Sequence, residues 1–148
     1  MSTLYLAGPM TGLPDENRPL FRRAAEQLRK AGYTVYSPVE WEPQDASATY
    51  DDKLEIDISM IMKVRPEMIV LLPGWENSKG ARAEAYIIGE FMGHTVARYI
   101  SEGESFRLAQ FRPEFVLQTV AYSVHPQVYI ENMPNDPVTA DTKISDNL

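Results

Sequence analysis

The chain has 148 residues, no cysteine, two histidines and a formal net charge of −7. This length suits a single domain with a hydrophobic core, and the lack of cysteine excludes a disulfide framework and a cysteine-ligated metal. The negative charge argues against a nucleic-acid polymer as partner, because phosphate contacts require a basic surface. His94 and His125 are too few and too far apart to suggest a zinc site, so neither a metal nor a cofactor is expected.

The sequence gives no sign of a membrane segment. It lacks the run of about 18 or more apolar residues that a transmembrane helix needs. Its first ten residues, MSTLYLAGPM, lack the charged region and long apolar core of a secretory signal. We therefore expect a cytoplasmic protein with no membrane partner.

Segments typical of strands alternate with segments typical of helices along the first two thirds of the chain. Short runs rich in apolar residues predict strands at Thr3–Ala7, Tyr33–Tyr36, Met68–Leu72 and Thr95–Tyr99. Apolar residues at helical spacing predict helices at Pro19–Ala31, Asp51–Val64 and Gly80–Met92. Gly32 and Gly93 follow the first and third of these helices, as expected of helix ends.

The pattern weakens after the fourth predicted strand. A helix is predicted at 113–124 and a fifth strand at 127–130. Residues 131–148 are polar and contain Pro134 and Pro137, which is typical of a disordered tail. We expect one domain over residues 1–130 followed by this tail.

Alternating strands and helices predict an α/β domain with a mostly parallel sheet and helices on both faces. In such sheets ligands bind beyond the carboxyl ends of the strands, where the strand order reverses. With a flavodoxin-like strand order, this crevice lies between the first and third strands. The loops at that place are residues 8–17 and 73–79.

A glutamate interrupts the apolar face of the predicted helix 80–92. With about 100° of rotation per residue, Glu84 falls between Ile88 and Phe91. That face also carries Ala81, Ala85 and Met92 and should meet the core, whereas Lys79, Arg82, Tyr86 and Glu90 should face water. An inward carboxylate is costly unless it is paired or solvated, and such groups are enriched at functional sites. The alternative is a helix start that is buried all round, with Glu84 accepting hydrogen bonds from a neighbouring loop.

The loop after the first strand, AGPMTGLPDENR, is rich in glycine and proline. The backbone N–H groups of Met10, Thr11 and Gly12, with the Thr11 hydroxyl, could hold a phosphate. Pro9 has no N–H to contribute. A tight turn without a ligand is the alternative, and we count Gly8 with the candidate substrate-binding residues.

Two further polar residues have both a structural and a functional interpretation. Ser78 could cap the helix that follows it or bind an anion at the same helix start, beside Gly80. Asp57 lies between Ile56 and Ile58, and could be a second carboxylate in the crevice or part of the exposed face of an ordinary helix.

These motifs together resemble a known family. They are YLAGPMTGLPDENRPLF from Tyr5, DISMI from Asp57 and LLPGWENSKGARAE from Leu71. Over residues 3–98 the chain is similar to an uncharacterised family of bacteria and phages within the nucleoside 2-deoxyribosyltransferase superfamily. That superfamily has a flavodoxin-like domain and usually forms homodimers or larger homo-oligomers, which the resemblance implies here too.

The resemblance implies roles for particular residues. It makes Glu84 the catalytic nucleophile, Tyr5 a residue of the sugar site and Asp57 the residue that acts on the departing base. Six residues before the nucleophile, the transferases carry an aspartate and the nucleoside 5′-monophosphate hydrolases carry a serine that binds phosphate. This chain has Ser78 there and so resembles the hydrolases. It departs from them at Pro9, where they carry a phosphate-binding serine, and a serine that their partner subunit donates has no assigned counterpart.

We therefore expect hydrolysis of the N-glycosidic bond of a (2′-deoxy)nucleoside 5′-monophosphate through a covalent glycosyl-glutamate intermediate. The alternatives are exchange of bases between nucleosides, a non-catalytic nucleotide-binding module, and a purely structural role. The base is not identified. Trp41, Glu40 and Tyr50 could contact it, although Trp41 could equally cap the core.

Overall fold

The computed structural model describes residues 2–43 and 47–111 of the chain. Their strands form a five-stranded sheet in the order β2-β1-β3-β4-β5. The strands are β1 (Thr3–Ala7), β2 (Thr34–Tyr36), β3 (Met68–Leu71), β4 (Thr95–Glu102) and β5 (Ser105–Phe111). The helices are α1 (Arg18–Lys30), α2 (Tyr50–Val64) and α3 (Lys79–Ala85), which continues as the π-helix η4 (Tyr86–Phe91). Short 3₁₀ turns are η1 (Pro14–Asn17), η2 (Pro38–Glu40) and η3 (Trp75–Asn77).

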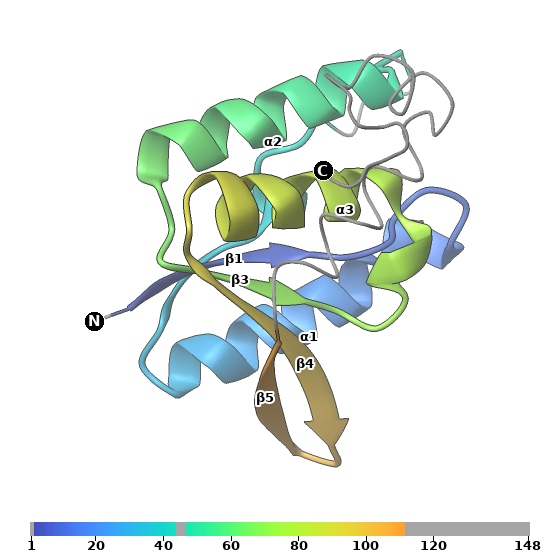
Figure 1. The fold of residues 1–148 in the computed structure, drawn as a ribbon. Helices are drawn as coiled ribbons and strands as arrows, with labels where there is room; N and C mark the ends of the chain where they lie inside the picture. Colours follow the sequence, from blue (N-terminus) through green and yellow to red (C-terminus); the bar gives the residue numbers. More distant parts are fainter. Residues whose placement is uncertain (1, 44–46, 112–148) are drawn as a thin grey trace, which may run out of the picture.

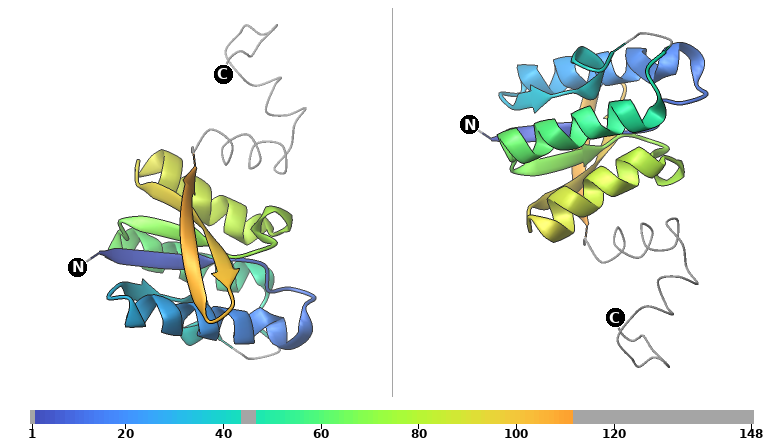
Figure 2. Two further views of the ribbon diagram at one scale, coloured as in Figure 1. Left: turned by 90° about the horizontal axis from the view of Figure 1, so that it is seen from below. Right: turned by 90° about the horizontal axis from the view of Figure 1, so that it is seen from above.

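Helices cover both faces of the sheet, with α1 on one face and α2 and α3 on the other (Figures 1 and 2). Successive residues of a strand point to opposite faces. In β1, Leu4 and Leu6 pack into the α1-side core with Phe21, whereas Tyr5 and Ala7 pack into the α3-side core. The sheet is therefore buried on both faces, as its continuous apolar strands predict.

The predicted α/β flavodoxin-like fold is confirmed. Strands β2, β1, β3 and β4 are parallel, and β1 lies between β2 and β3. β2 pairs with one edge of β1, and β3, the next strand along the chain, pairs with the other edge. The strand order therefore reverses at β1 and β3. Ala7 pairs with Leu71, which brings the loops after these two strands to the same edge of the sheet.

The structure adds a hairpin to the sequence prediction. β4 runs on to Glu102, beyond the predicted end at Tyr99, and turns at Gly103, whose φ is 70°, into the unpredicted strand β5. β5 is antiparallel to β4, and its half-buried Phe106 and Leu108 pack against the α1-side core. The predicted helix 113–124, strand 127–130, tail 131–148 and domain boundary lie outside the described residues.

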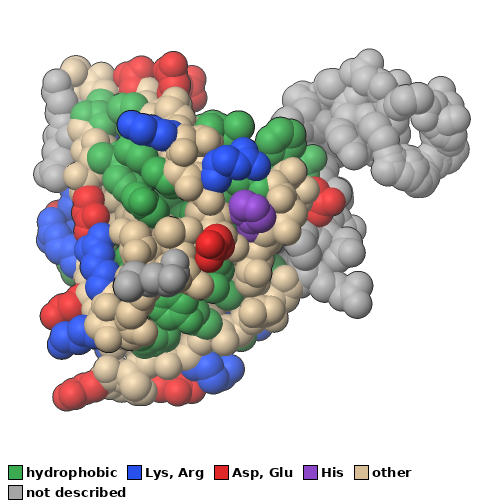
Figure 3. Space-filling model, turned by 90° about the vertical axis from the view of Figure 1, so that its left-hand side faces the viewer, with side chains coloured by type: hydrophobic (Ala, Val, Ile, Leu, Met, Phe, Trp, Pro, Cys, Tyr) green, Lys and Arg blue, Asp and Glu red, His purple; other side chains and the backbone are tan. Residues whose placement is uncertain are grey.

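The end of the molecule where the parallel strands begin is shown in Figure 3. Acidic and basic side chains lie side by side among hydrophobic ones on this end. No helix in the described part of the chain is long and apolar enough to cross a membrane.

One residue of the third predicted helix is on the wrong face. Phe91 was expected in the core but is 69% exposed, whereas Ile88 is fully buried as expected. The cause is the change from α-helix to π-helix after Ala85: Met92 N–H donates to the carbonyl of Ile87, five residues back, at 2.9 Å. A wider turn rotates each residue by less than 100°, so the helical plot loses its phase before Phe91.

This phase change predicts that Ile88 and Phe91 differ in their importance for stability. We expect Ile88→Ala to lower the free energy of unfolding by about 2–5 kcal/mol because it leaves a cavity. We expect Phe91→Ala to change it by about 0.5 kcal/mol or less, because the ring is mostly in water. Urea unfolding of both variants measures the difference, and equal losses would contradict the π-helical phase.

Candidate functional site

A cavity of about 60 Å³ lies at the carboxyl-terminal edge of the sheet, at the predicted crevice. Its lining comes from the loops after β1 and β2, from one side of α2 and from the start of α3. The predicted residues Gly8, Met10, Thr11, Ser78, Gly80, Asp57 and Glu84 all belong to it. Segments far apart in the sequence therefore meet at one place.

Glu84 is positioned by the start of α3. Ser78 is the N-cap of this helix, and its Oγ accepts a hydrogen bond from Ala81 N–H at 3.2 Å. Glu84 follows about one and a half turns later, is 4% exposed, and accepts a hydrogen bond from the Tyr5 hydroxyl at 2.9 Å. The inward direction that the helical plot predicts is thus confirmed, and Tyr5 of β1 is its partner.

Asp57 projects from α2 toward the same cavity. It is 4% exposed, and its Oδ1 accepts a hydrogen bond from Trp41 Nε1 at 2.9 Å. It is also hydrogen-bonded to Glu84 and to Glu42. The interpretation of Asp57 as part of an exposed helix face is wrong, because this is one of the two buried residues of α2.

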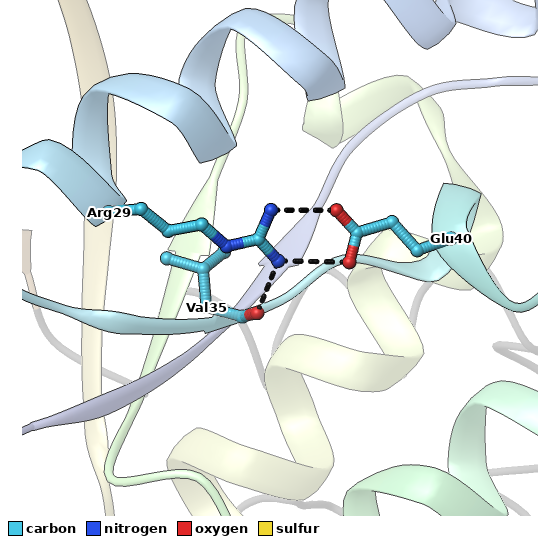
Figure 4. Close-up of polar contacts among 3 residues, drawn as sticks. All are labelled: Arg29, Val35 and Glu40. Atoms are coloured by element: carbon cyan, nitrogen blue, oxygen red, sulfur yellow. Dashed lines mark hydrogen bonds and ion pairs between the residues drawn. The ribbon is translucent and has the colours of Figure 1, made fainter.

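Glu42 is a third buried carboxyl of the site that the sequence did not reveal. It follows η2 in the loop after β2, lines the cavity and is hydrogen-bonded to Asp57. A loop has no periodicity from which an inward direction can be predicted. Glu40, two residues earlier, is not among the residues that line the cavity. It forms a bidentate ion pair with Arg29 at 2.8 and 2.9 Å (Figure 4). Glu40 therefore does not occupy the base-contacting position that the sequence suggested.

Burial raises the pKa values of all three carboxyls. The pKa is raised to about 7 for Asp57, to about 8 for Glu84 and to about 9 for Glu42, with desolvation as the largest cause in each. Hydrogen bonds from Tyr5 and Asp57 oppose this at Glu84, because they favour its ionised form. The pKa of Tyr5 is itself raised well above its usual value by burial and by the charge of Glu84, so Tyr5 stays a hydrogen-bond donor. At neutral pH the three carboxyls therefore share fewer than three negative charges.

Other predicted site residues lie around the cavity rather than in its lining. Trp41 lies behind Asp57, with its ring centroid 6.0 Å from that of Tyr5, and packs against the α3-side core. Its predicted packing against the core is thus confirmed, whereas its contact with a base stays a prediction. Gly12 lies outside the lining and forms a turn with φ of 84°.

The glycines at the cavity have clear packing reasons. A Cβ on Gly8 would lie 2.9 Å from the Cβ of Leu72, so β1 and β3 can close together only with glycine there. A Cβ on Gly80 would lie 3.1 Å from the Tyr50 hydroxyl, so glycine lets α3 approach α2. Of the four residues of α3 and η4 that were predicted to face water, Lys79 and Glu90 are exposed, whereas Arg82 and Tyr86 are half-buried.

Comparison with known proteins identifies the family. Residues 2–97 match the model of the family described as "Domain of unknown function (DUF4406)". The chain belongs to the DUF4406 family. A comparison with curated proteins found no match.

A solved structure has the same fold as this DUF4406 domain. It is described as the crystal structure of a conserved protein from Enterococcus faecalis V583. The TM-score is 0.52 at 19% sequence identity, over 82% of this chain and 87% of that one. At this identity the similarity supports the α/β flavodoxin-like fold alone.

The raised pKa of Glu42 predicts how stability depends on pH. Its pKa is about 9 in the fold against 4.5 for a free glutamate, so between these values the folded state holds a proton that the unfolded state has lost. Stability that is present at low pH should therefore fall as the pH rises through this window. We expect Glu42→Gln, which cannot ionise, to raise the Tm by a few degrees relative to the wild type at about pH 9, and by little at about pH 5.

Thermal unfolding across this pH range measures the effect. Glu55→Gln makes the same change on the exposed surface of α2 and serves as the control. A Glu42→Gln profile parallel to that of the wild type would show that Glu42 ionises as readily in the fold as in the unfolded chain.

Proposed function

We propose that this protein hydrolyses the N-glycosidic bond of a (2′-deoxy)nucleoside 5′-monophosphate through a covalent bond between the sugar and Glu84. The observation that carries the proposal is the hydrogen-bonded pair of buried carboxyls, Glu84 and Asp57, in one cavity beyond β1 and β3. Two carboxyls with different partners can divide the work of nucleophile and acid. The resemblance of the three sequence motifs to the nucleoside 2-deoxyribosyltransferase superfamily supports the same assignment.

Glu84 and Asp57 titrate as a coupled pair, and the reactive form is the one in which Asp57 holds the proton and donates a hydrogen bond to ionised Glu84. In the first step, this Glu84 carboxylate attacks C1′ of the sugar. The C1′–N bond breaks, its electron pair leaves with the base, and a glycosyl ester forms on Glu84. The departing nitrogen takes a proton from Asp57, the general acid. The Tyr5 hydroxyl, 2.9 Å from Oε2, holds the attacking carboxylate in place and stabilises its charge before attack.

In the second step, the Asp57 carboxylate takes a proton from water, and the resulting hydroxide attacks C1′. The ester bond breaks, which restores ionised Glu84 and protonated Asp57 and releases the sugar phosphate. Glu42 is hydrogen-bonded to Asp57, and its raised pKa keeps a proton beside Asp57 between the two steps. A second base in place of water would give base exchange, the transferase alternative.

Ser78 supports a phosphorylated substrate. Its Oγ uses a lone pair to cap α3, which leaves its hydroxyl proton for an oxygen of the substrate. An aspartate at this position, as in the transferases, would repel a phosphate, whereas a hydroxyl can donate to one. The non-catalytic alternative has one observation in its favour, since a buried carboxyl cluster can also bind the edge of a base without chemistry.

The proposed mechanism predicts that substitutions of Glu84 and Asp57 reduce the rate of base release to different extents. Glu84→Gln should abolish the release of free base, because an amide is a poor nucleophile and does not form the ester. Asp57→Asn should slow release by about 10²–10⁴-fold, because the leaving base lacks its acid. The reduction in rate caused by Asp57→Asn should be smaller for a substrate whose leaving group departs without a proton.

Chromatography of reactions with ribo- and deoxyribonucleosides, with and without a 5′-phosphate, measures this release. Glu76→Gln, at an exposed position on η3, is the matched control and should keep full activity. Base released equally by Glu84→Gln and the wild type would remove the nucleophile assignment. A wild type that binds monophosphates without releasing any base would favour the binding module.

A further inference from the structure

The cavity has an unusual charge for a site that, under the proposed function, receives a phosphate. The acidic residues lining it are Glu16, Glu42, Asp57 and Glu84, and Lys53 is the one basic residue among the described residues of the lining. A phosphate placed near ionised carboxylates is repelled unless a cation lies close to it. The lining supplies such a cation at Lys53, and Arg18, which lies outside the lining, reaches the same place through its ion pair with Glu16.

Lys53 and a second cation hold Glu16 between them. Lys53 Nζ lies 3.5 Å from Oε2 of Glu16, and Arg18 Nη2 lies 2.8 Å from Oε1. Each oxygen of one carboxylate thus faces a different cation. A phosphate group also presents several oxygens, so two of them suit the same pair of cations.

Arg18 has more donor capacity than the protein uses. It is 8% exposed, and its Nε is buried without a hydrogen-bond partner among the described residues. Its other ion pair within the described part of the chain is with the exposed Asp15, at the long distance of 3.7 Å. A buried guanidinium with an unused donor suits a ligand with more oxygens than one carboxylate.

The segment that carries Glu16 has a strained backbone. Asp15, Glu16 and Asn17 have φ values of 51°, 51° and 62°, three successive non-glycine residues in the left-handed region. This conformation is unfavourable for side chains with a Cβ, and here the ion pairs and a 2.9 Å hydrogen bond from Asn17 Nδ2 to the Pro9 carbonyl hold it. Sites for small molecules measure about 300–1,000 Å³, and the cavity of about 60 Å³, with Glu16 in its lining, is much smaller than that.

We propose that Arg18 and Lys53 form the cationic half of a phosphomonoester site and that Glu16 occupies this site until a phosphate displaces it. Ser78 and the loop after β1 supply the neutral donors on the same cavity. Displacement lets the residues around Glu16 leave their left-handed conformation, which offsets part of the cost of breaking its ion pairs. The site then prefers phosphorylated ligands to their unphosphorylated counterparts, because only a second anion can replace Glu16.

Calorimetric titration with inorganic phosphate, and with nucleoside 5′-monophosphates and the matching nucleosides, tests this proposal. The proteins are the wild type, Glu16→Gln and Lys53→Gln, each also carrying Glu84→Gln for the nucleotide titrations so that binding is measured without turnover. Glu26→Gln on α1 and Lys63→Gln on α2 make the same changes at exposed positions and are the matched controls.

Glu16→Gln should bind phosphate and monophosphates about threefold to tenfold more tightly, because the competing charge is gone. Lys53→Gln should bind monophosphates about tenfold more weakly and nucleosides unchanged, and Lys53→Arg should restore binding. The two controls should behave as the wild type. The melting temperature of each variant shows whether it is folded.

Equal phosphate affinity in Glu16→Gln and the wild type would overturn the proposal. So would a Lys53→Gln variant that loses nucleosides and monophosphates alike, or a failure of phosphate and every monophosphate to bind any of these proteins. The variants could change monophosphate binding as expected while the wild type releases no base. This result would contradict the proposed hydrolysis and support the phosphate site.

Discussion

The structure depends on one constraint, which is that three carboxyl groups are buried beside one another. Glu42, Asp57 and Glu84 are all less than a tenth exposed. Lys53, the basic residue of the cavity lining in the described part of the chain, forms its ion pair with Glu16 and not with any of these three. Such a cluster is tolerable only if protons are retained in it, and burial retains them because it raises the pKa values of all three carboxyls. The same retained protons give the site an acid beside a potential nucleophile, so the cost to folding and the capacity for chemistry have one origin.

The fold places these groups by ordinary means. The reversal of strand order at β1 and β3 brings two loops together, and the parallel register Ala7 to Leu71 brings them to the same edge. Tyr5, whose side chain points to the α3 side of β1, donates a hydrogen bond to Glu84 of the helix that covers this face. Trp41 reaches Asp57 from the loop after β2. Each acid is thus held by a residue of a different element, which fixes the carboxyls relative to one another.

Features that repeat regularly along the chain can be predicted from the sequence, whereas side-chain directions in irregular segments cannot. The alternation of strands and helices predicts the sheet, and the helical plot predicts the inward direction of Glu84, because both are regular patterns. Glu42 was missed because nothing in an irregular loop separates it from Glu40, which forms an ion pair on the surface. Phe91 was misplaced because no sequence signal marked the π-helical turn. The bridge from Arg18 through Glu16 to Lys53 depends on a left-handed backbone without glycine, which residue types do not predict.

The most direct test of this account is a pH titration of the side-chain carboxyl carbons by ¹³C NMR, with Glu42, Asp57 and Glu84 assigned by single amide substitutions. We predict three midpoints well above those of exposed carboxyls, and a midpoint for Asp57 that shifts when Glu42 is replaced, since their titrations are coupled. Three midpoints near pH 4, independent of one another, would show that water or cations neutralise the cluster. The proton-sharing site would then not exist.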